Sequence, residues 1–184
     1  MSGNGIRCLA AALRRATNAD WDSVEIETAV GLRTVRLWVE DSSEMGSVDM
    51  GDVTFGDDIE GAFGVADLGN PHVVVMDHAD WTTRDCEDVA ERLSARVGGA
   101  NVEFVTIIGS DHLSIRVIER GVGWTLACGT GSCASAALTR RAGLTGSTAR
   151  VDNPGGTLTV VLDGSRVKLS GPVQFVADVQ WLET

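Results

Sequence analysis

The sequence predicts an α+β fold with a largely antiparallel sheet. Short alternating strands are separated by turn signals, helical segments number only three, and two of these helices begin with similar sequences. The chain has 184 residues, of which 43% are hydrophobic and 22% charged, so it is long enough to bury a core of its own.

Two β-hairpins are predicted, one near each end of the chain. Residues 24–29 and 32–40 flank a turn at Gly31, and residues 158–162 and 166–169 flank Asp163-Gly164. Further strands are predicted at residues 73–76, 102–108, 112–119 and 173–181. Between them, a helix is predicted from an N-cap at Thr82 or Thr83 to about Val97, ended by Gly98-Gly99, with its apolar face formed by Cys86, Val89, Ala90, Leu93 and Val97.

The other two helices form an internal repeat. Without gaps, residues 2–16 match residues 128–142 at seven of fifteen positions, including both glycines of Gly-x-Gly. Ser2 and Cys128 then begin Ala-rich helices, where backbone N–H groups bind anions and lower a thiol pKa. A pseudo-two-fold axis would bring both helix ends to one ligand, which suits acid and base groups on opposite faces of a carbon. The alternative is that the two segments match by chance, because both are alanine-rich helices that follow glycine turns.

Composition and motifs exclude several classes of function. A net charge of −11 and a pI near 4.6 make nucleic acid and anionic membranes poor partners. With no signal peptide or long apolar segment, we expect a cytoplasmic protein with four free thiols. A single lysine, Lys168, argues against pyridoxal phosphate, and the three histidines and the cysteines lack metal-ligand spacing. We therefore expect no cofactor and no metal.

Seven segments together resemble the diaminopimelate epimerase family over nearly the whole chain. They are residues 3–8, 48–51, 67–72, 101–105, 119–123, 127–131 and 154–156. The resemblance implies two pseudo-symmetric domains, each a mostly antiparallel sheet around a central helix, and a homodimer. It also implies cofactor-independent inversion of the α-carbon of LL-diaminopimelate to the meso form, a step of lysine and peptidoglycan biosynthesis. Residues 1–46, which 172–184 could rejoin, would be the remainder of the first domain, and residues 47–171 the second.

Candidate site residues follow from the same resemblance. Cys128 is similar to one catalytic thiol, and Ser2 falls at the position of the other. Substrate contacts are implied for Gly3, Asn4, Asn70, Asn101, Glu119, Arg120, Gly129 and Thr130, while His72 and Glu119 would tune the thiols. Read locally, each has a simpler interpretation: His72 and the asparagines could fix turns, Glu119 and Arg120 could form a surface ion pair, and Cys133 could be packing.

Three departures from the family pattern keep other functions open. Ser2 replaces a cysteine, and a hydroxyl is a far weaker acid than a thiol. The chain begins at the motif itself, so we expect an incomplete first domain. Trp124 stands where the family has a polar residue and would be a cleft wall or a strand residue. The alternatives are an enzyme like proline racemase or hydroxyproline dehydratase, which Ser2 favours, and an inactive amino-acid-binding fragment.

Overall fold

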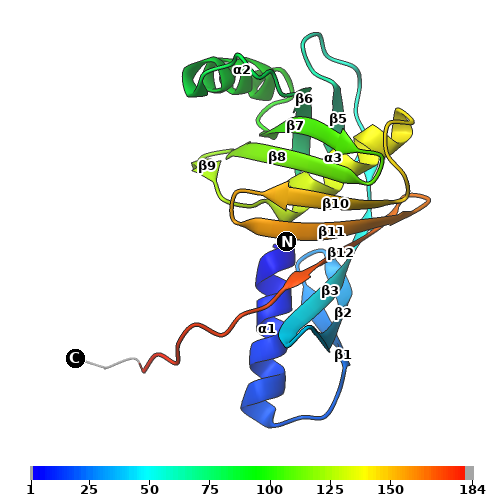
Figure 1. Cartoon of the computed structure of the whole chain (residues 1–184), viewed down its shortest axis with the longest axis vertical. Helices are drawn as coiled ribbons and strands as arrows, with labels where there is room; N and C mark the ends of the chain where they lie inside the picture. Colours follow the sequence, from blue (N-terminus) through cyan, green and yellow to red (C-terminus); the bar gives the residue numbers. More distant parts are fainter. Residues whose placement is uncertain (1, 181–184) are drawn as a thin grey trace.

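The computed structural model describes residues 2–180 and confirms the α+β class (Figure 1). Its three helices are α1 (Gly3–Thr17), α2 (Thr83–Arg96) and α3 (Gly129–Arg141). The strands are β1 (Ser23–Thr28), β2 (Gly31–Glu40), β3 (Ser43–Asp52), β4 (Thr54–Phe55), β5 (Gly64–Asp67), β6 (Pro71–Met76), β7 (Asn101–Gly109), β8 (His112–Glu119), β9 (Gly123–Thr125), β10 (Thr148–Asn153), β11 (Gly156–Asp163) and β12 (Arg166–Pro172).

All twelve strands belong to one sheet. Its order is β1-β2-β3-β12-β11-β10-β8-β7-β6-β5-β4, with β9 paired to β8. Most neighbours are antiparallel, but β6 with β7 and β8 with β10 are parallel. Parallel neighbours need a long crossover, and here the two crossovers contain α2 and α3 respectively. The two helices pack on opposite faces of this part of the sheet.

Two parts of the molecule are visible in Figure 1, joined by β3 and β12. The smaller part contains α1 with β1 to β3, and the larger contains α2, α3 and the remaining strands. The predicted boundary between residues 46 and 47 lies inside β3, which pairs with β2 on one side and β12 on the other. No linker separates the parts at this point, and the division into domains stays a prediction.

Alternate residues of β6 and β7 face opposite layers, as the period of a strand requires. One face packs on the apolar side of α2, which confirms the predicted stripe; its members are Val73, Val75, Val102 and Phe104 from the sheet and Cys86, Ala90 and Leu93 from the helix. The other face carries Val74 and Val105 in the core that contains α3. Because His72 and Glu103 share this second face, their side chains lie on the side of α3.

Local signals predicted both hairpins and the limits of α2. A capping box at Thr82 and Asp85 begins α2, and Val97 caps its end. The strand predicted for residues 173–181 is wrong: residues 173–180 form no strand, and residue 181 lies outside the described part. After the hydrogen bond from Val173 N to Glu44 O, only Ser43 of β3 remains, so the tail reaches the end of its partner strand. It contacts α1 instead, where Arg15 bonds to Asp178.

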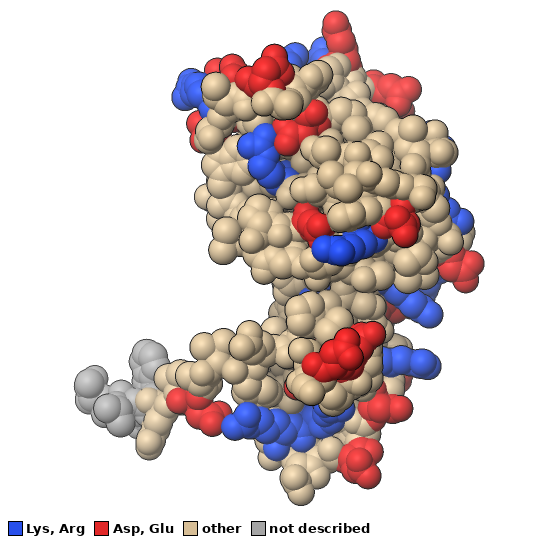
Figure 2. Space-filling model, in the orientation of Figure 1, with Lys and Arg blue, Asp and Glu red and all other residues tan. Residues whose placement is uncertain are grey.

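The surface carries both signs of charge. On the face in Figure 2, acidic and basic side chains are interspersed over both parts of the molecule. Among the described residues, no helix combines the length and the apolar character that a membrane crossing requires.

Candidate active site

The two repeated sequences form the same local structure. Ser2 is the N-cap of α1 and its Oγ accepts a hydrogen bond from Gly5 N at 3.1 Å. Cys128 is the N-cap of α3 and its Sγ accepts one from Gly131 N at 3.3 Å. Both side chains therefore take a backbone N–H of the first helical turn, as an N-cap residue does. The prediction that each residue begins a helix is confirmed.

The beginnings of the two helices lie against each other. A Cβ added to Gly129 would be 3.7 Å from the Cα of Gly3, and only 2.8 Å from Cδ2 of Leu169. A Cβ added to Gly3 would be 2.6 Å from the same Leu169 atom. The first glycine of each repeat therefore packs closely on Leu169. Two helix N-termini, each with a partial positive charge, meet at one place, as the repeat predicted.

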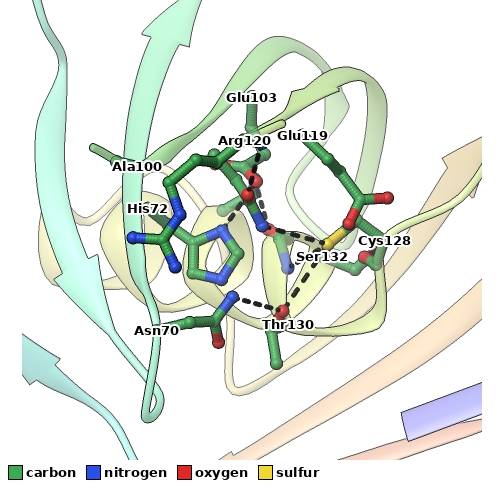
Figure 3. A network of polar contacts seen from close by, with 12 residues as sticks. Asn70, His72, Ala100, Glu103, Glu119, Arg120, Cys128, Thr130 and Ser132 are labelled. Carbon is green, nitrogen blue, oxygen red and sulfur yellow. Dashed lines mark hydrogen bonds and ion pairs between the residues drawn. The ribbon is translucent and has the colours of Figure 1, made fainter. Parts of the chain in front are cut away.

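The Cys128 thiol is almost wholly enclosed. Only 6% of the residue is exposed, and Sγ lies 3.5 Å from Thr130 Oγ1 and 3.8 Å from Asn101 Nδ2 (Figure 3). Burial, followed by the nearby charge of Glu103, raises the thiol pKa to about 11, although hydrogen bonds from Thr130 and Gly131 act in the opposite direction. In this state the thiol is protonated near neutral pH, despite its position at a helix N-terminus.

Two asparagines connect the thiol to neighbouring loops. Asn101 begins β7 and uses both ends of its amide: Nδ2 faces Cys128 Sγ, and Oδ1 accepts from Arg120 N at 3.0 Å. Asn70 precedes β6 and its Nδ2 donates to Thr130 Oγ1 at 3.4 Å. These hydrogen bonds join residues far apart in the chain, whereas an asparagine that only fixes a turn bonds to residues beside it. Asn70, Asn101, Thr130 and Cys128 form one polar network (Figure 3).

Glu119 and Arg120 follow one another but do not pair. Glu119 ends β8 and accepts a hydrogen bond from Thr125 Oγ1 at 2.5 Å. The exposed Arg120 side chain donates to Gly99 O at 3.0 Å. Their charged groups are thus held by different segments, Glu119 by the end of β9 and Arg120 by Gly99, and these two residues do not form the surface ion pair considered from sequence.

Glu103 belongs to the site and was not among the residues singled out from sequence. Its Oε1 lies 2.7 Å from His72 Nδ1, and both side chains are completely buried. Ligand-type atoms of His72, Glu103 and Cys128 all lie within 4.8 Å of one another. A signal was present in the sequence, because Glu103 is the one charged residue between Val102 and Ile108, where every other residue except Thr106 is apolar.

Supporting polar residues hold each helix end. Asn153 Oδ1 lies 3.4 Å from Cys128 N and bonds to Ser132, at positions that the sequence analysis did not single out. On the other side, Asn4 Oδ1 accepts from the buried Arg7, which also bonds to Gly3 O. Gly3 and Asn4 lie next to α3, since a Cβ added to Gly129 would be 3.7 Å from Gly3 Cα and 3.8 Å from Asn4 Oδ1.

The remaining candidates have structural roles. Cys133 and Cys86 are buried in the core and Cys8 is exposed, and all four cysteines are free. Trp124 is a strand residue whose Nε1 donates to Glu87 of α2 at 3.1 Å and whose ring lies 5.9 Å from Phe104. Its contacts are on the α2 face of the sheet, opposite to Glu103.

Known proteins share this fold. A structure described as a predicted epimerase from Pseudomonas aeruginosa matches with a TM-score of 0.78 and 16% identity, over 100% of this chain and 75% of that one. A PhzF-family phenazine biosynthesis protein from Bacillus anthracis matches with a TM-score of 0.65 and 16% identity, over 92% and 73%. A hydroxyproline epimerase from Agrobacterium vitis, with bound trans-4-hydroxy-L-proline, has a TM-score of 0.70 and 16% identity, over 94% and 63%.

Sequence comparison identifies the family directly. The model for diaminopimelate epimerase matches residues 64–176, a range that contains Cys128, its asparagine partners, the His72–Glu103 pair and Glu119-Arg120. The match covers more than half of the chain and agrees with the mixed α+β sheet and with the epimerases among its structural neighbours. This chain therefore belongs to the diaminopimelate epimerase family.

Proposed function

We propose that this protein removes and returns the α-proton of an amino acid, with LL-diaminopimelate as the substrate that family membership suggests. The observation that carries the proposal is the meeting of two helix N-termini, one capped by Cys128 and the other by Ser2. Backbone N–H groups at such ends bind a carboxylate. They also stabilise the negative charge that develops on it when the α-proton leaves.

Charge in the site explains how Cys128 becomes a base. Burial and the negative charges of Glu103 and Glu119 raise its pKa in the structure without substrate. An amino acid brings an ammonium group, and a positive charge near the thiol favours the thiolate. We infer that substrate binding generates the base, with the thiol proton passing to the neighbouring His72 ring, and that the free enzyme keeps a protonated thiol.

Ser2 provides the second group in this mechanism. Removal of the proton by the Cys128 thiolate on one face leaves a carbanion, which Ser2 Oγ–H protonates on the other face to give the inverted product. The resulting alkoxide regains a proton from solvent, which can reach Ser2 because this residue is exposed. A hydroxyl is a far weaker acid than a thiol, so delivery of the proton from Ser2 is expected to limit the rate of inversion.

Proton NMR in D₂O tests the function directly. LL- and meso-diaminopimelate are incubated with reduced protein, and both the α-proton signal and the configuration are followed. Exchange with inversion supports the epimerase, whereas no exchange by folded protein with either isomer contradicts it. A parallel incubation with trans-4-hydroxy-L-proline distinguishes the proline-racemase alternative.

The Ser2→Cys variant tests the second group. A thiol has a pKa closer to neutral than a hydroxyl, so we expect inversion to become markedly faster while exchange at the Cys128 face changes little. An unchanged inversion rate would exclude Ser2 from the reaction. The Cys8→Ser variant is the matched control, because Cys8 is exposed on the same helix and should leave both rates unchanged.

Assembly and location are further parts of the proposal. Family membership suggests a homodimer, which sedimentation equilibrium would test. We also propose a cytoplasmic protein, as the biosynthesis of lysine and peptidoglycan precursors would require.

A further inference from the structure

Glu103 is an unusual residue for the centre of a sheet. It lies in β7 between Val102 and Phe104, and neither its carboxyl nor the neighbouring side chains reach solvent. A buried carboxylate is strongly unfavourable unless other groups compensate its charge. Its environment should therefore show what the carboxylate is for.

Strand register explains how Glu103 meets His72. In the parallel pair of β6 and β7, His72 is opposite Asn101 and Val74 is opposite Glu103. His72, Asn101 and Glu103 thus share one face of the sheet. His72 Nδ1 then lies 2.7 Å from Glu103 Oε1, with no exposed surface on either side chain.

Helix α3 provides the second compensation. A Cβ added to Gly131 would be 2.4 Å from Glu103 Oε1, so the carboxylate packs directly on the first turn of α3. The N-terminal turn of a helix has unpaired N–H groups and a partial positive charge, which stabilise an anion there. A glycine at position 131 is required for this approach.

We propose that Glu103 is a positioning residue that sets the orientation and the tautomer of His72, an inference that rests on the proposed function. An ionised carboxylate only accepts hydrogen bonds, so Nδ1 carries the proton of the neutral ring. Nε2 is left with a free lone pair. It is buried and has no hydrogen-bond partner among the described residues. In Figure 3, one ring nitrogen of His72 points toward Glu103 and the second nitrogen faces away from the carboxylate.

This arrangement makes Nε2 a proton acceptor inside the site. The proton that Nε2 can take is that of the Cys128 thiol, because ligand-type atoms of His72 and Cys128 lie within 4.8 Å of each other, and the ring remains bonded to Glu103 when it does so. Release of that proton restores the original state before the next cycle. Glu103 does not touch the reacting atoms in this scheme and acts only through His72, as the third member of a catalytic triad acts through its histidine.

Nitrogen NMR of the imidazole rings tests the proposal without requiring turnover. The chain has three histidines, so His78→Gln and His112→Gln variants assign the signals that remain to His72. With ¹⁵N-histidine label at pH 8, we expect a protonated Nδ1 and an unprotonated Nε2. The opposite tautomer in the unsubstituted protein would overturn the proposal.

Glu103→Leu removes the acceptor with an apolar side chain and leaves the buried His72 without its partner, so circular dichroism must first confirm that this variant is folded. We expect loss of the single Nδ1–H tautomer and a fall in α-proton exchange of about 10- to 100-fold, part of what a general acid or base contributes. Glu103→Asp, which keeps the carboxylate, should recover part of the Nδ1–H tautomer and part of the α-proton exchange. Val105→Ile, two residues along the same face of β7, should change neither.

The two readouts separate this inference from the proposed function. Unchanged ring signals in Glu103→Leu would exclude a positioning role even if the enzyme epimerises its substrate. Lack of exchange in the unsubstituted protein, with the Nδ1–H tautomer present, would contradict the proposed reaction and leave the role of Glu103 in orienting His72 supported.

Discussion

Reactivity of the Cys128 thiol is the most direct measure of the electrostatics of this site. Only the thiolate attacks an alkylating reagent. Burial raises the thiol pKa from 9.0 to about 11, which lowers the thiolate fraction about 100-fold at any pH well below 9. At pH 8 we therefore expect iodoacetamide to react with Cys128 at least about 100-fold more slowly than with free cysteine. Enclosure of the thiol slows the reaction further.

Dependence on pH distinguishes a raised pKa from simple lack of access. Alkylation is quenched at intervals between pH 7 and pH 10.5, and the modified peptides are quantified by mass spectrometry. A raised pKa predicts a rate that still increases about tenfold per unit above pH 9, where an ordinary thiol levels off. Restricted access alone gives a slow rate that levels off at the ordinary pH. Circular dichroism at each pH confirms that the protein remains folded, and the exposed Cys8 reports on the reagent.

The cause of the shift can be tested in the same assay. Glu103→Leu removes one negative charge beside the thiol but leaves it buried. We expect faster alkylation of Cys128 at pH 8 in this variant, yet still slower than free cysteine, because burial is the larger cause. Alkylation of unsubstituted protein that levels off near neutral pH would refute the reasoning, since it would show a thiolate in the free enzyme.

Two other predictions concern stability. Gly131→Ala should destabilise the protein by roughly 1–3 kcal/mol in urea unfolding, because its Cβ would be 2.4 Å from Glu103 Oε1, whereas Gly109→Ala, whose Cβ would meet nothing closer than 3.8 Å, should have little effect. Equal losses in the two variants would contradict the packing argument. Hydrogen bonds from Thr157 and His112 lower the pKa of Asp152 to about 2, so its carboxylate stabilises the fold above about pH 4 and this contribution is lost as pH falls toward 2. Asp152→Asn should therefore lower the urea midpoint at pH 7 and differ progressively less from the unsubstituted protein between pH 5 and pH 3; a constant difference would argue against that pKa.

Elements with strong local signals could be predicted from the sequence. The N-cap of α2, the Gly-x-Gly helix starts and the Asp163-Gly164 turn depend on contacts between residues close in the chain. Strand β3 was not predicted, because its sequence, Ser43 to Asp52, has few β-branched residues and two glycines. It is a strand because β2 and β12 pair with both of its edges. The pairing with β2 is a tight hairpin, but the pairing with β12, which places Val48 opposite Leu169, is distant in the chain and has no local signature.

The same distinction applies to the site. Family resemblance identified the residues around Cys128. Glu103 can be recognised as part of the site only in the folded sheet, which brings it to His72, 31 residues earlier in the chain. In the sequence it is a single acidic residue in a strand. Asn153 is similar, since its contact with Cys128 N joins the end of β10 to the start of α3 across 25 residues. Roles that depend on strand register could not be read from spacing along the chain.

The two helix ends share one backbone geometry but differ in their access to solvent, and this difference should control the outcome of the reaction. Cys128 is 6% exposed and is surrounded by Asn101, Thr130 and Glu103, whereas Ser2 is exposed and only caps its helix. A proton held by Cys128 is shielded from water, so it returns to the face from which it came unless Ser2 delivers a solvent proton to the other. Each inverted product molecule formed in D₂O should then carry deuterium, while retained molecules keep most of their hydrogen. Equal deuterium content in inverted and retained diaminopimelate at low conversion would show that burial of the thiol does not protect its proton.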